Sequence, residues 1–351
     1  MSADARASPG AQSVPAPLSA EQIAEAEQGG WVPLLLLDRT LFSGPPQMRA
    51  NEVAAEAGVA PEVARAMWRA MGFSEGLDGQ PSFYPEDAKA LAHAGEQLAT
   101  GDALESVVRQ TRIINAAVSR IAESLGDDVV ARLRALREEG VPDEEAADRL
   151  QHALNIDHLE RLLGYFLRRH LRDALWRKLA VPPDRLGQGA LTVGFVDLVR
   201  FTALTEEVAE DELDALVTRF GDVAHERITA GGGRMVKMIG DEVMFVADDA
   251  RRGASIALDL VDAYGADDKL PPARAGLACG EVLSRDGDCY GPVVNLASRI
   301  VDVARPRAVV TSEPLHECLA GSRELLWRRL PSKRLKGIGL SRLWSLRRAG
   351  I

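Results

Sequence analysis

The second half of the chain alternates short apolar runs with segments of three- and four-residue periodicity. The runs have the length of buried strands, and the periodic segments predict amphipathic helices. In order, the predicted elements are a strand at Leu191–Asp197, a helix at Asp211–Thr229, a hairpin of Arg234–Ile239 and Glu242–Val246, a helix at Ala250–Tyr264, a strand at Ala273–Leu283, a helix at Pro292–Ala304 and a strand at Val309–Thr311 with two more after it. This order predicts an α+β domain of ferredoxin-like topology over residues 191–351.

The first half has helical periodicity, which predicts an all-α domain over residues 18–180. Residues 1–17, rich in Ala, Ser and Pro, are predicted to be a disordered tail, and residues 181–190 a linker. Short helices broken by Gly and Pro are expected in 18–98, and longer ones in 99–180, at Gly101–Leu125, at Val129–Glu139 and from Pro142 toward Ala180.

The last of these helices carries a mostly apolar stripe, formed by Leu159, Leu162, Leu163, Phe166, His170, Leu171, Leu175 and Leu179. Two interpretations remain open: a helix packed on its own domain, or a coupling helix that leads into the next domain.

Residues Met48–Met71 predict two short helices around a turn at Ala57–Pro61, which is typical of a helix-turn-helix. With Phe73–Pro85 as a small wing, the segment loosely resembles MerR-like winged helices. We favour an ordinary helical packing unit over DNA binding, because the second helix offers a duplex only Arg65 and Arg69.

Composition narrows the class of protein. The 351 residues suggest two domains, and 46% hydrophobic residues suffice for sizeable cores. A net charge of −10 argues against nucleic acid as the main partner. The three cysteines have no metal or redox spacing, which fits a reducing compartment. No apolar run approaches the ~20 residues of a membrane span, so a cytoplasmic location is expected.

Two carboxylates, Asp197 and Asp241, each stand at the end of an apolar run. A carboxylate there is costly unless it is paired or coordinates a cation. Either one alone is better explained as a helix cap or a turn residue. Four further polar residues change that judgement: Lys237, Asp288, Asn295 and Arg299.

The segments V-K-M-I-G-D-E-V-M-F, G-D-C-Y-G-P-V-V-N-L-A-S-R and R-L-K-G-I occur in the order and spacing of a known family. Over roughly Ala190–Leu346 the chain resembles the class III nucleotide cyclases. With its helical first half, it most resembles the mycobacterial pH-responsive adenylate cyclases. The resemblance implies attack of the ribose 3′-hydroxyl on the α-phosphorus of ATP, giving cyclic AMP and pyrophosphate.

The resemblance also implies residue roles. Two divalent cations, Mg²⁺ or Mn²⁺, would be held by Asp197, Asp241 and the carbonyl of Leu198. Lys237 and Asp288 would bind adenine, Asn295 would orient the ribose, and Arg299 would neutralise the transition state. The triphosphate would contact Lys336 and the turn leading into Phe201 and Thr202. Arg200 departs from the family, in which a small residue is common at that position.

The spacing along the sequence predicts which residues share a face in two of these cases. Lys237 precedes Asp241 by four residues in a strand, so both are expected on one face, together with Met235 and Ile239. Asn295 and Arg299, four apart on a helix, also share a face.

The family places lysine and asparagine of this kind on opposite subunits, which implies a homodimer with two composite sites. The first half would then be a regulatory domain with a small effector, a proton or a lipid, and His152, His158 and His170 are candidate sensors. The alternatives are a guanylate cyclase, and a DNA-binding regulator with a nucleotide-sensing cyclase-like domain. A diguanylate cyclase is disfavoured because its G-G-D/E-E-F turn is absent.

Overall fold

The computed structural model describes residues 24, 28–29, 31–42, 46–73, 81–179, 188–205 and 208–350. The predicted tail at 1–17 lies outside these ranges. The chain forms two compact units, Met1–His170 and Leu171–Ile351. Among the described helices, none combines the length and the apolar character that a bilayer crossing needs.

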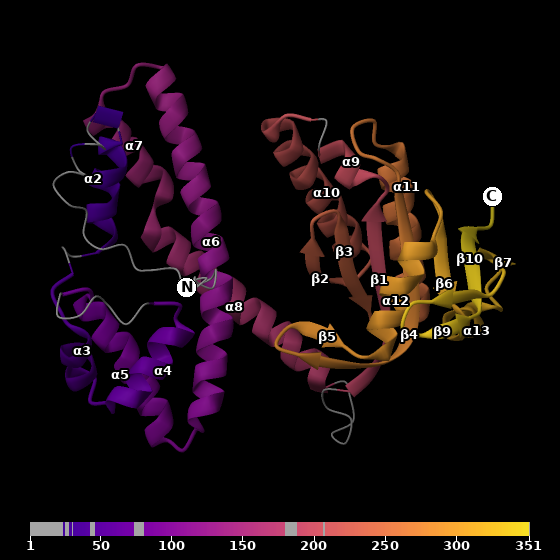
Figure 1. Ribbon diagram of the computed structural model, residues 1–351, viewed down its shortest axis with the longest axis horizontal. Helices are drawn as coiled ribbons and strands as arrows, with labels where there is room; N and C mark the ends of the chain where they lie inside the picture. The colour runs from indigo at the N-terminus through magenta and orange to yellow at the C-terminus, as the bar shows by residue number, and fades with distance from the viewer. Residues whose placement is uncertain are drawn as a thin grey trace, which may run out of the picture. The chain divides into compact units, whose positions relative to one another are not determined.

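The first unit is built along one long helix, α6 (Leu104–Glu138), with a helical cluster at each end (Figure 1). The sequence predicted two helices here, and that prediction was wrong. Gly126 stands between them, but a single helical glycine costs only about 1 kcal/mol relative to alanine. The helix therefore continues through it.

At one end of α6 lies the predicted helix-turn-helix, formed by α3 (Ala50–Glu56) and α4 (Pro61–Ala70) and covered by α5 (Pro85–Ala99). Its core includes Trp68 and Leu91. The segment around Phe83 pairs antiparallel with Met48, while residues 74–80 of the predicted wing lie outside the described residues.

At the other end of α6, α2 (Val32–Leu41) and α7 (Asp143–Leu154) pack around Leu37, Leu133 and Leu150. The pattern from Pro142 predicted one continuous helix, but Asn155 breaks it with a φ of 29°. The Asn155 side chain then accepts a hydrogen bond from the backbone amide of His158 at 3.0 Å, which caps the start of α8 (Ile156–Leu179).

Helix α8 buries none of its residues in the single chain. The apolar stripe predicted from its sequence is largely solvent-exposed, with Leu171, Leu175 and Leu179 at 54%, 50% and 76% exposure. Of the two interpretations left open by the sequence, the exposure of these side chains does not support a helix packed on its own domain.

The second unit contains the ferredoxin-like sheet predicted from the sequence. Its strand order is β2-β3-β1-β4-β6-β10-β7, and β5 pairs with β4 (Figure 1). The elements are β1 (Gln188–Leu198), α9 (Phe201–Thr205), α10 (Glu210–Ala230), β2 (Arg234–Ile239), β3 (Glu242–Ala247), α11 (Ala250–Ala266), β4 (Ala273–Arg285), β5 (Asp288–Tyr290), α12 (Pro292–Val303), β6 (Val309–Ser312), α13 (Glu313–Leu319), β7 (Leu325–Arg329), β8 (Lys333–Leu335), β9 (Gly339–Ser341) and β10 (Leu343–Arg348). β1 begins three residues inside the segment predicted as a linker.

Two apolar clusters cover the two faces of this sheet. Val196 and Leu198 of β1 pack with α10, α11 and α13 on one face, whereas Val193 and Phe195 pack with α12 on the other. This alternation is the period of two expected of a strand. It places Asp197 on the α12 face. Gly276 of β4 lies so close to α12 that a Cβ there would stand 2.3 Å from the backbone nitrogen of Val301.

Candidate active site

Asp197 and Asp241 come together at one end of the sheet, as the sequence predicted. Asp197, the penultimate residue of β1, stands directly opposite Glu242, the first residue of β3. The backbone amide of Leu198 donates a 3.1 Å hydrogen bond to the carbonyl of Asp241. The two carboxylates therefore project from adjacent backbone segments, although 44 positions separate them in the sequence.

Two more acids, Glu242 and Asp302, belong to the same acidic group. Burial, followed by the charges of Asp197, Asp302 and Asp241, raises the pKa of Glu242 to about 7. Burial also raises the pKa of Asp197, although Arg274 opposes the shift. Repulsion among partly buried carboxylates indicates a site that is completed by positive charge.

Arg274 was not among the site residues predicted from the sequence. This residue stands opposite Asp197 in the β1–β4 register, and its Nε and Nη2 lie 2.7 and 2.6 Å from Oδ2 of Asp197. Its Nη1 donates to the backbone carbonyl of Asp302 at 3.1 Å. The available signal was an arginine inside a predicted apolar strand, but only the strand register identifies its partner.

The side chains at this end of the sheet form only a partial set of metal ligands. Among the described residues, no three His, Cys, Asp or Glu side chains converge on one point as a complete metal site. Asp197, Asp241 and the carbonyl of Leu198 supply hard oxygen ligands of the kind that Mg²⁺ and Mn²⁺ prefer. Such a partial set fits a cation that takes its remaining ligands from phosphate oxygens and water.

Lys237 and Asp288 are in direct contact. Nζ of Lys237 lies 2.6 Å from Oδ2 of Asp288, and the side chains are 39% and 25% exposed. Burial tends to raise the pKa of Asp288, but hydrogen bonds from Lys237 and from the amide of Cys289 outweigh it, so this pKa is lowered. Asp288 is therefore ionised at neutral pH, with Lys237 as its counter-charge.

A bulge in β2 decides which face Lys237 occupies. The β2–β3 register shifts between Met235 and Lys237, so Lys237 stands opposite Met244, on the α12 face. Met235 packs against the cluster on the other face. The expectation that Met235 shares the face of Lys237 was wrong, because the extra residue of a bulge interrupts the alternation. Ile239 is 62% exposed.

Arg234, at the start of β2, was also missed. Its Nη1 donates to the carbonyl of Gly287 at 2.9 Å, and its Nη2 lies 3.5 Å from Sγ of Cys289. These two positions flank Asp288. Arg234 thereby fastens the β4–β5 turn to the strand that carries Lys237.

Asn295 and Arg299 lie on the exposed side of α12, opposite its buried residues Ala297, Ile300 and Val301. Nη1 of Arg299 lies 3.2 Å from Oδ2 of Asp302, one turn along the same helix. The pair shares a face as predicted, and the single chain presents both side chains to solvent.

The residues predicted to contact phosphate differ in whether their side chains are accessible. The side chain of Phe201 is buried in the core, so only its backbone is available to a ligand. Arg200, just before it, has a φ of 67° and is exposed. This left-handed conformation explains why a small residue suits the position. Lys336 is exposed in the turn between β8 and β9. The side chain of Thr202 lies outside the described residues.

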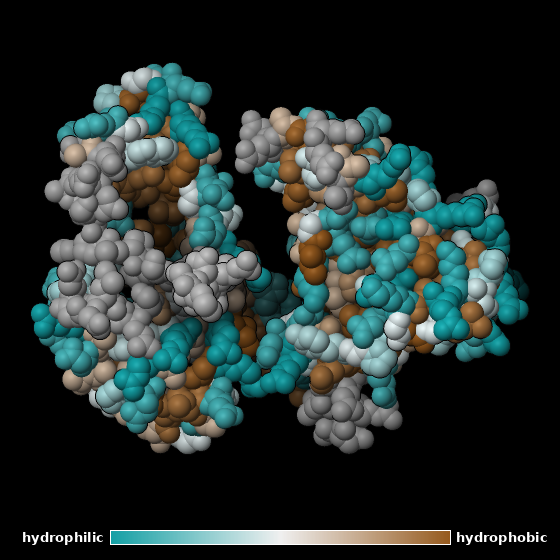
Figure 2. Space-filling model, viewed as in Figure 1, coloured by the Kyte–Doolittle hydropathy of each residue, from teal (hydrophilic) through white to brown (hydrophobic). Residues whose placement is uncertain are grey.

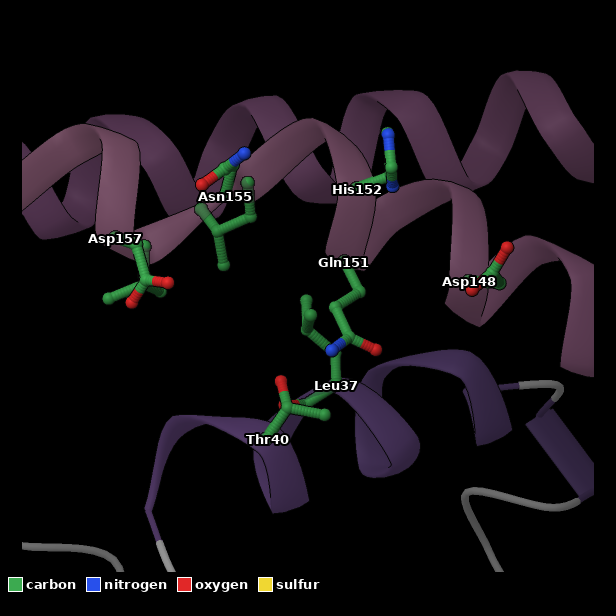
Figure 3. A pocket seen from close by; sticks show the side chains of 9 residues that line it. Leu37, Thr40, Asp148, Gln151, His152, Asn155 and Asp157 are labelled. Carbon is green, nitrogen blue, oxygen red and sulfur yellow. The ribbon is translucent and has the colours of Figure 1, made fainter.

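The first unit contains a cavity of about 320 Å³ between α2, α7 and the start of α8 (Figure 3). Asp148, Gln151, His152, Asn155 and Asp157 contribute most of its polar lining. Gln151 extends from α7 toward Leu37 of α2. Because ligand sites for lipids are mostly apolar, this lining does not suit an acyl chain.

Comparisons with known proteins cover both units. A family model described as the adenylate and guanylate cyclase catalytic domain matches residues 186–346. An adenylate cyclase of Glutamicibacter nicotianae is 36% identical over 298 residues, which are 78% of this chain and 72% of that protein. An adenylate cyclase of Streptomyces coelicolor is 35% identical over 314 residues, 88% of this chain and 80% of that protein. A pH-sensitive adenylate cyclase of Mycobacterium tuberculosis is 32% identical over 332 residues, 90% of this chain and 82% of that protein.

Proposed function

The chain belongs to the adenylate and guanylate cyclase family, and we propose that it is an adenylate cyclase that converts ATP to 3′,5′-cyclic AMP and pyrophosphate. The observation that supports ATP as the substrate is the contact between Lys237 and Asp288. A lysine donates to N1 of adenine, and a carboxylate accepts from its exocyclic amine. Guanine has the opposite polarity at both positions, so it would leave these polar groups unpaired.

The acidic end of the sheet would hold the reacting phosphates through cations. Asp197, Asp241 and the carbonyl of Leu198 would be the protein ligands, and bound Mg²⁺ or Mn²⁺ would stabilise charge on the attacking and leaving oxygens. Arg274, which lies against Asp197, would keep that carboxylate oriented and would supply positive charge near the bound phosphates. Backbone amides at Phe201 and the ammonium of Lys336 would contact the rest of the triphosphate.

Asn295 and Arg299 would act on the substrate bound by a second copy of the chain. They are exposed on α12, where Arg299 has only an exposed acid of its own helix, Asp302, as an ion-pair partner within 4 Å among the described residues. Exposed apolar side chains adjoin the Lys237–Asp288 pair along β2, β4 and β5 and supply surface for a dimer contact. These side chains are Met238, Ile239, Leu283 and Tyr290. On the side of the molecule seen in Figure 2, hydrophobic patches interrupt an otherwise hydrophilic surface of the second unit.

The decisive experiment is complementation between two inactive variants. Lys237→Ala and Asn295→Ala, each purified alone, are expected to produce little cyclic AMP from ATP with Mn²⁺. Mixed and re-equilibrated, they should regain up to half of the wild-type activity per heterodimer, because one composite site of the two is intact. Two Lys237→Ala preparations mixed in the same way are the control. Absence of rescue in a mixture shown to form heterodimers would exclude shared sites.

The alternatives receive no comparable support. The exposed charges of α4 are Glu62, Arg65 and Arg69, too few cations for a surface that follows a phosphate backbone. Guanylate cyclase activity is tested in the same assay by replacing ATP with GTP.

We further propose that protons, rather than a lipid, are the effector of the first unit. His152 lines a polar cavity together with Asp148 and Asp157, so its protonation would change the charge of that lining. His158 and His170 follow on α8. Replacing the three histidines together by Asn should flatten the pH dependence of cyclic AMP formation between about pH 5 and 8, the range in which histidine is the side chain that most readily changes charge. An unchanged profile would rule out this sensor.

A further inference from the structure

Two of the three cysteines lie side by side on one face of the second unit. Cys279 is half-buried in β4, and Cys318 is exposed on α13. Cys318 lies near enough to Cys279 to contribute to the raised pKa of its thiol. This proximity is supported from both sides of Cys318, because Leu315 and Leu319 of α13 are buried in the same apolar cluster against which Cys279 packs.

The third cysteine has a different environment. Cys289 is buried in the cluster on the opposite face of the sheet, with the guanidinium of Arg234 at 3.5 Å and the hydroxyl of Ser284 at 3.9 Å. It provides an internal comparison, a thiol of the same domain that has no thiol partner on its own face of the sheet. The pairing of Cys279 with Cys318 is invisible in the sequence, where 39 positions separate them.

We propose that Cys279 and Cys318 form an oxidation-sensitive dithiol, which closes to an intramolecular disulfide when a hydroperoxide reaches the exposed Cys318. Neighbouring thiols on two packed elements can be bridged when the backbone lets their Cα atoms approach to about 4.4–6.8 Å. This inference concerns a modification site and does not depend on the proposed enzymatic activity.

With hydrogen peroxide as the oxidant, the disulfide forms in two steps. The sulfur of Cys318 attacks one peroxide oxygen, the O–O bond breaks, and a sulfenic acid and one water form. The sulfur of Cys279 then attacks the sulfenic sulfur, the S–S bond forms, and the thiol proton leaves with the hydroxyl group as a second water. Two thiols are oxidised and one peroxide is reduced to two waters.

The order of the two steps follows from the environments of the thiols. Burial, together with the neighbouring Cys318, raises the pKa of Cys279 to about 11. Cys279 is therefore a poor first nucleophile, because thiolates and not thiols react with peroxide. Cys318 is the exposed partner and meets the oxidant first.

The disulfide would link α13 to β4, the strand that contains Arg274 and that a short turn joins to Asp288 of β5. It would close a loop between residues that are 39 positions apart. A cross-link of this span restricts the unfolded chain, so oxidation should raise the midpoint of thermal unfolding by about 5–10 °C, reversibly by dithiothreitol.

The test treats the full-length protein with a small excess of hydrogen peroxide and counts reactive thiols after denaturation. We expect a fall from three thiols to one, a mass loss of two hydrogens, and one tryptic species in which the Cys279 and Cys318 peptides are linked. Cys289→Ser should fall from two thiols to none. Cys318→Ser should form no intramolecular disulfide and show no rise in the unfolding midpoint.

Three outcomes would overturn the inference: all three thiols of the wild type stay titratable, Cys318 oxidises to a sulfinic acid without linking to Cys279, or the only disulfide joins Cys318 of two chains. Because Cys318 is exposed, its replacement by Ser does not disturb the core, and an unfolded variant is not expected to obscure the result.

Discussion

Lys237 and Asp288 are 51 positions apart, yet the ammonium of one and a carboxylate oxygen of the other are separated by 2.6 Å. β2 carries the lysine, and the short strand β5, which folds back on β4, carries the aspartate. Neither strand by itself brings the two side chains together. The bulge of β2 sets the face of Lys237, and Arg234 fastens the turn next to Asp288. A basic donor and an acidic acceptor are thus presented at one edge of the sheet.

Base selectivity should follow this pair. Lys237→Ala and Asp288→Ala are each expected to lower kcat/KM for ATP by about 10–100-fold, since a hydrogen bond to a charged group contributes about 1.5–3 kcal/mol. The ratio of activity with ATP to activity with GTP should fall in both variants. Steady-state kinetics with both nucleotides measures it. A reduced rate with an unchanged ATP/GTP ratio would contradict a role in reading the base.

Arg234 should position Asp288 without touching substrate. Arg234→Ala is expected to raise KM for ATP about tenfold with a smaller change in kcat, because it frees the turn on both sides of Asp288. Arg234→Lys, which can restore one donor to the Gly287 carbonyl, should recover part of the loss.

Arg251→Ala is the matched control for Arg234. Arg251 forms an exposed ion pair with Glu324 at 2.9 Å, and its removal should leave KM unchanged. Equal effects of the two alanine variants on KM would mean that the Arg234 contacts do not position the site.

The close approach of β4 to α12 should make Gly276 intolerant of a side chain. A Cβ at this position would lie 2.3 Å from the nitrogen of Val301 and 2.7 Å from the carbonyl oxygen of Ala297, both of them backbone atoms. Gly276→Ala should therefore reduce the free energy of unfolding by about 1–3 kcal/mol. It should also lower kcat, because the displaced helix carries Asn295 and Arg299.

The same substitution at Gly126, Gly126→Ala, should change the free energy of unfolding in the opposite direction. Gly126 is inside α6, and a Cβ there would meet no atom of the described residues within 4 Å. Alanine at this position should stabilise the protein by up to about 1 kcal/mol without changing kcat. Urea unfolding measures both variants, and a neutral Gly276→Ala would refute the steric argument.

The stability of the second unit should depend on pH through Asp267. Its side chain is 7% exposed and accepts hydrogen bonds from Nε of Arg219 at 2.6 Å and from the amides of Lys269 and Leu270. Burial tends to raise the pKa of Asp267, but these bonds outweigh burial and lower it below the ordinary value of 3.8. The native state therefore favours the ionised form. This contribution to stability is complete above pH 3.8 and is lost as the pH falls through the lowered pKa.

Asp267→Asn should accordingly reduce the free energy of unfolding at pH 7 by about 1.5–3 kcal/mol, the range for hydrogen bonds to a charged group. The difference from wild type should shrink as the pH falls below 3.8. Asp268→Asn, at the exposed neighbouring position, is the control and should have little effect at any pH. A difference in unfolding free energy that grows as the pH falls would contradict a lowered pKa of Asp267 in the native state.

Local sequence patterns were sufficient to predict most of the secondary structure of the second unit. The strand and helix order was predicted because each element has its own periodicity, and the ferredoxin-like topology follows from that order. The convergence of Asp197 and Asp241 was predictable for a related reason: the end of β1 and the β2–β3 turn are neighbours in this topology. In contrast, the continuity of α6 through Gly126 and the break at Asn155 depended on small energy differences that periodicity does not register.

By its own residues, the chain determined which segments form strands and helices, and it displayed the acidic, basic and amide groups that identify the family. The tertiary structure alone decided which of those groups meet. Arg274 reaches Asp197, Arg234 holds the turn of Asp288, and Cys318 approaches Cys279 only through strand register, a bulge and the packing of α13. These contacts join residues dozens of positions apart, and a pattern of near neighbours carries no record of the distances between them once the sheet has formed.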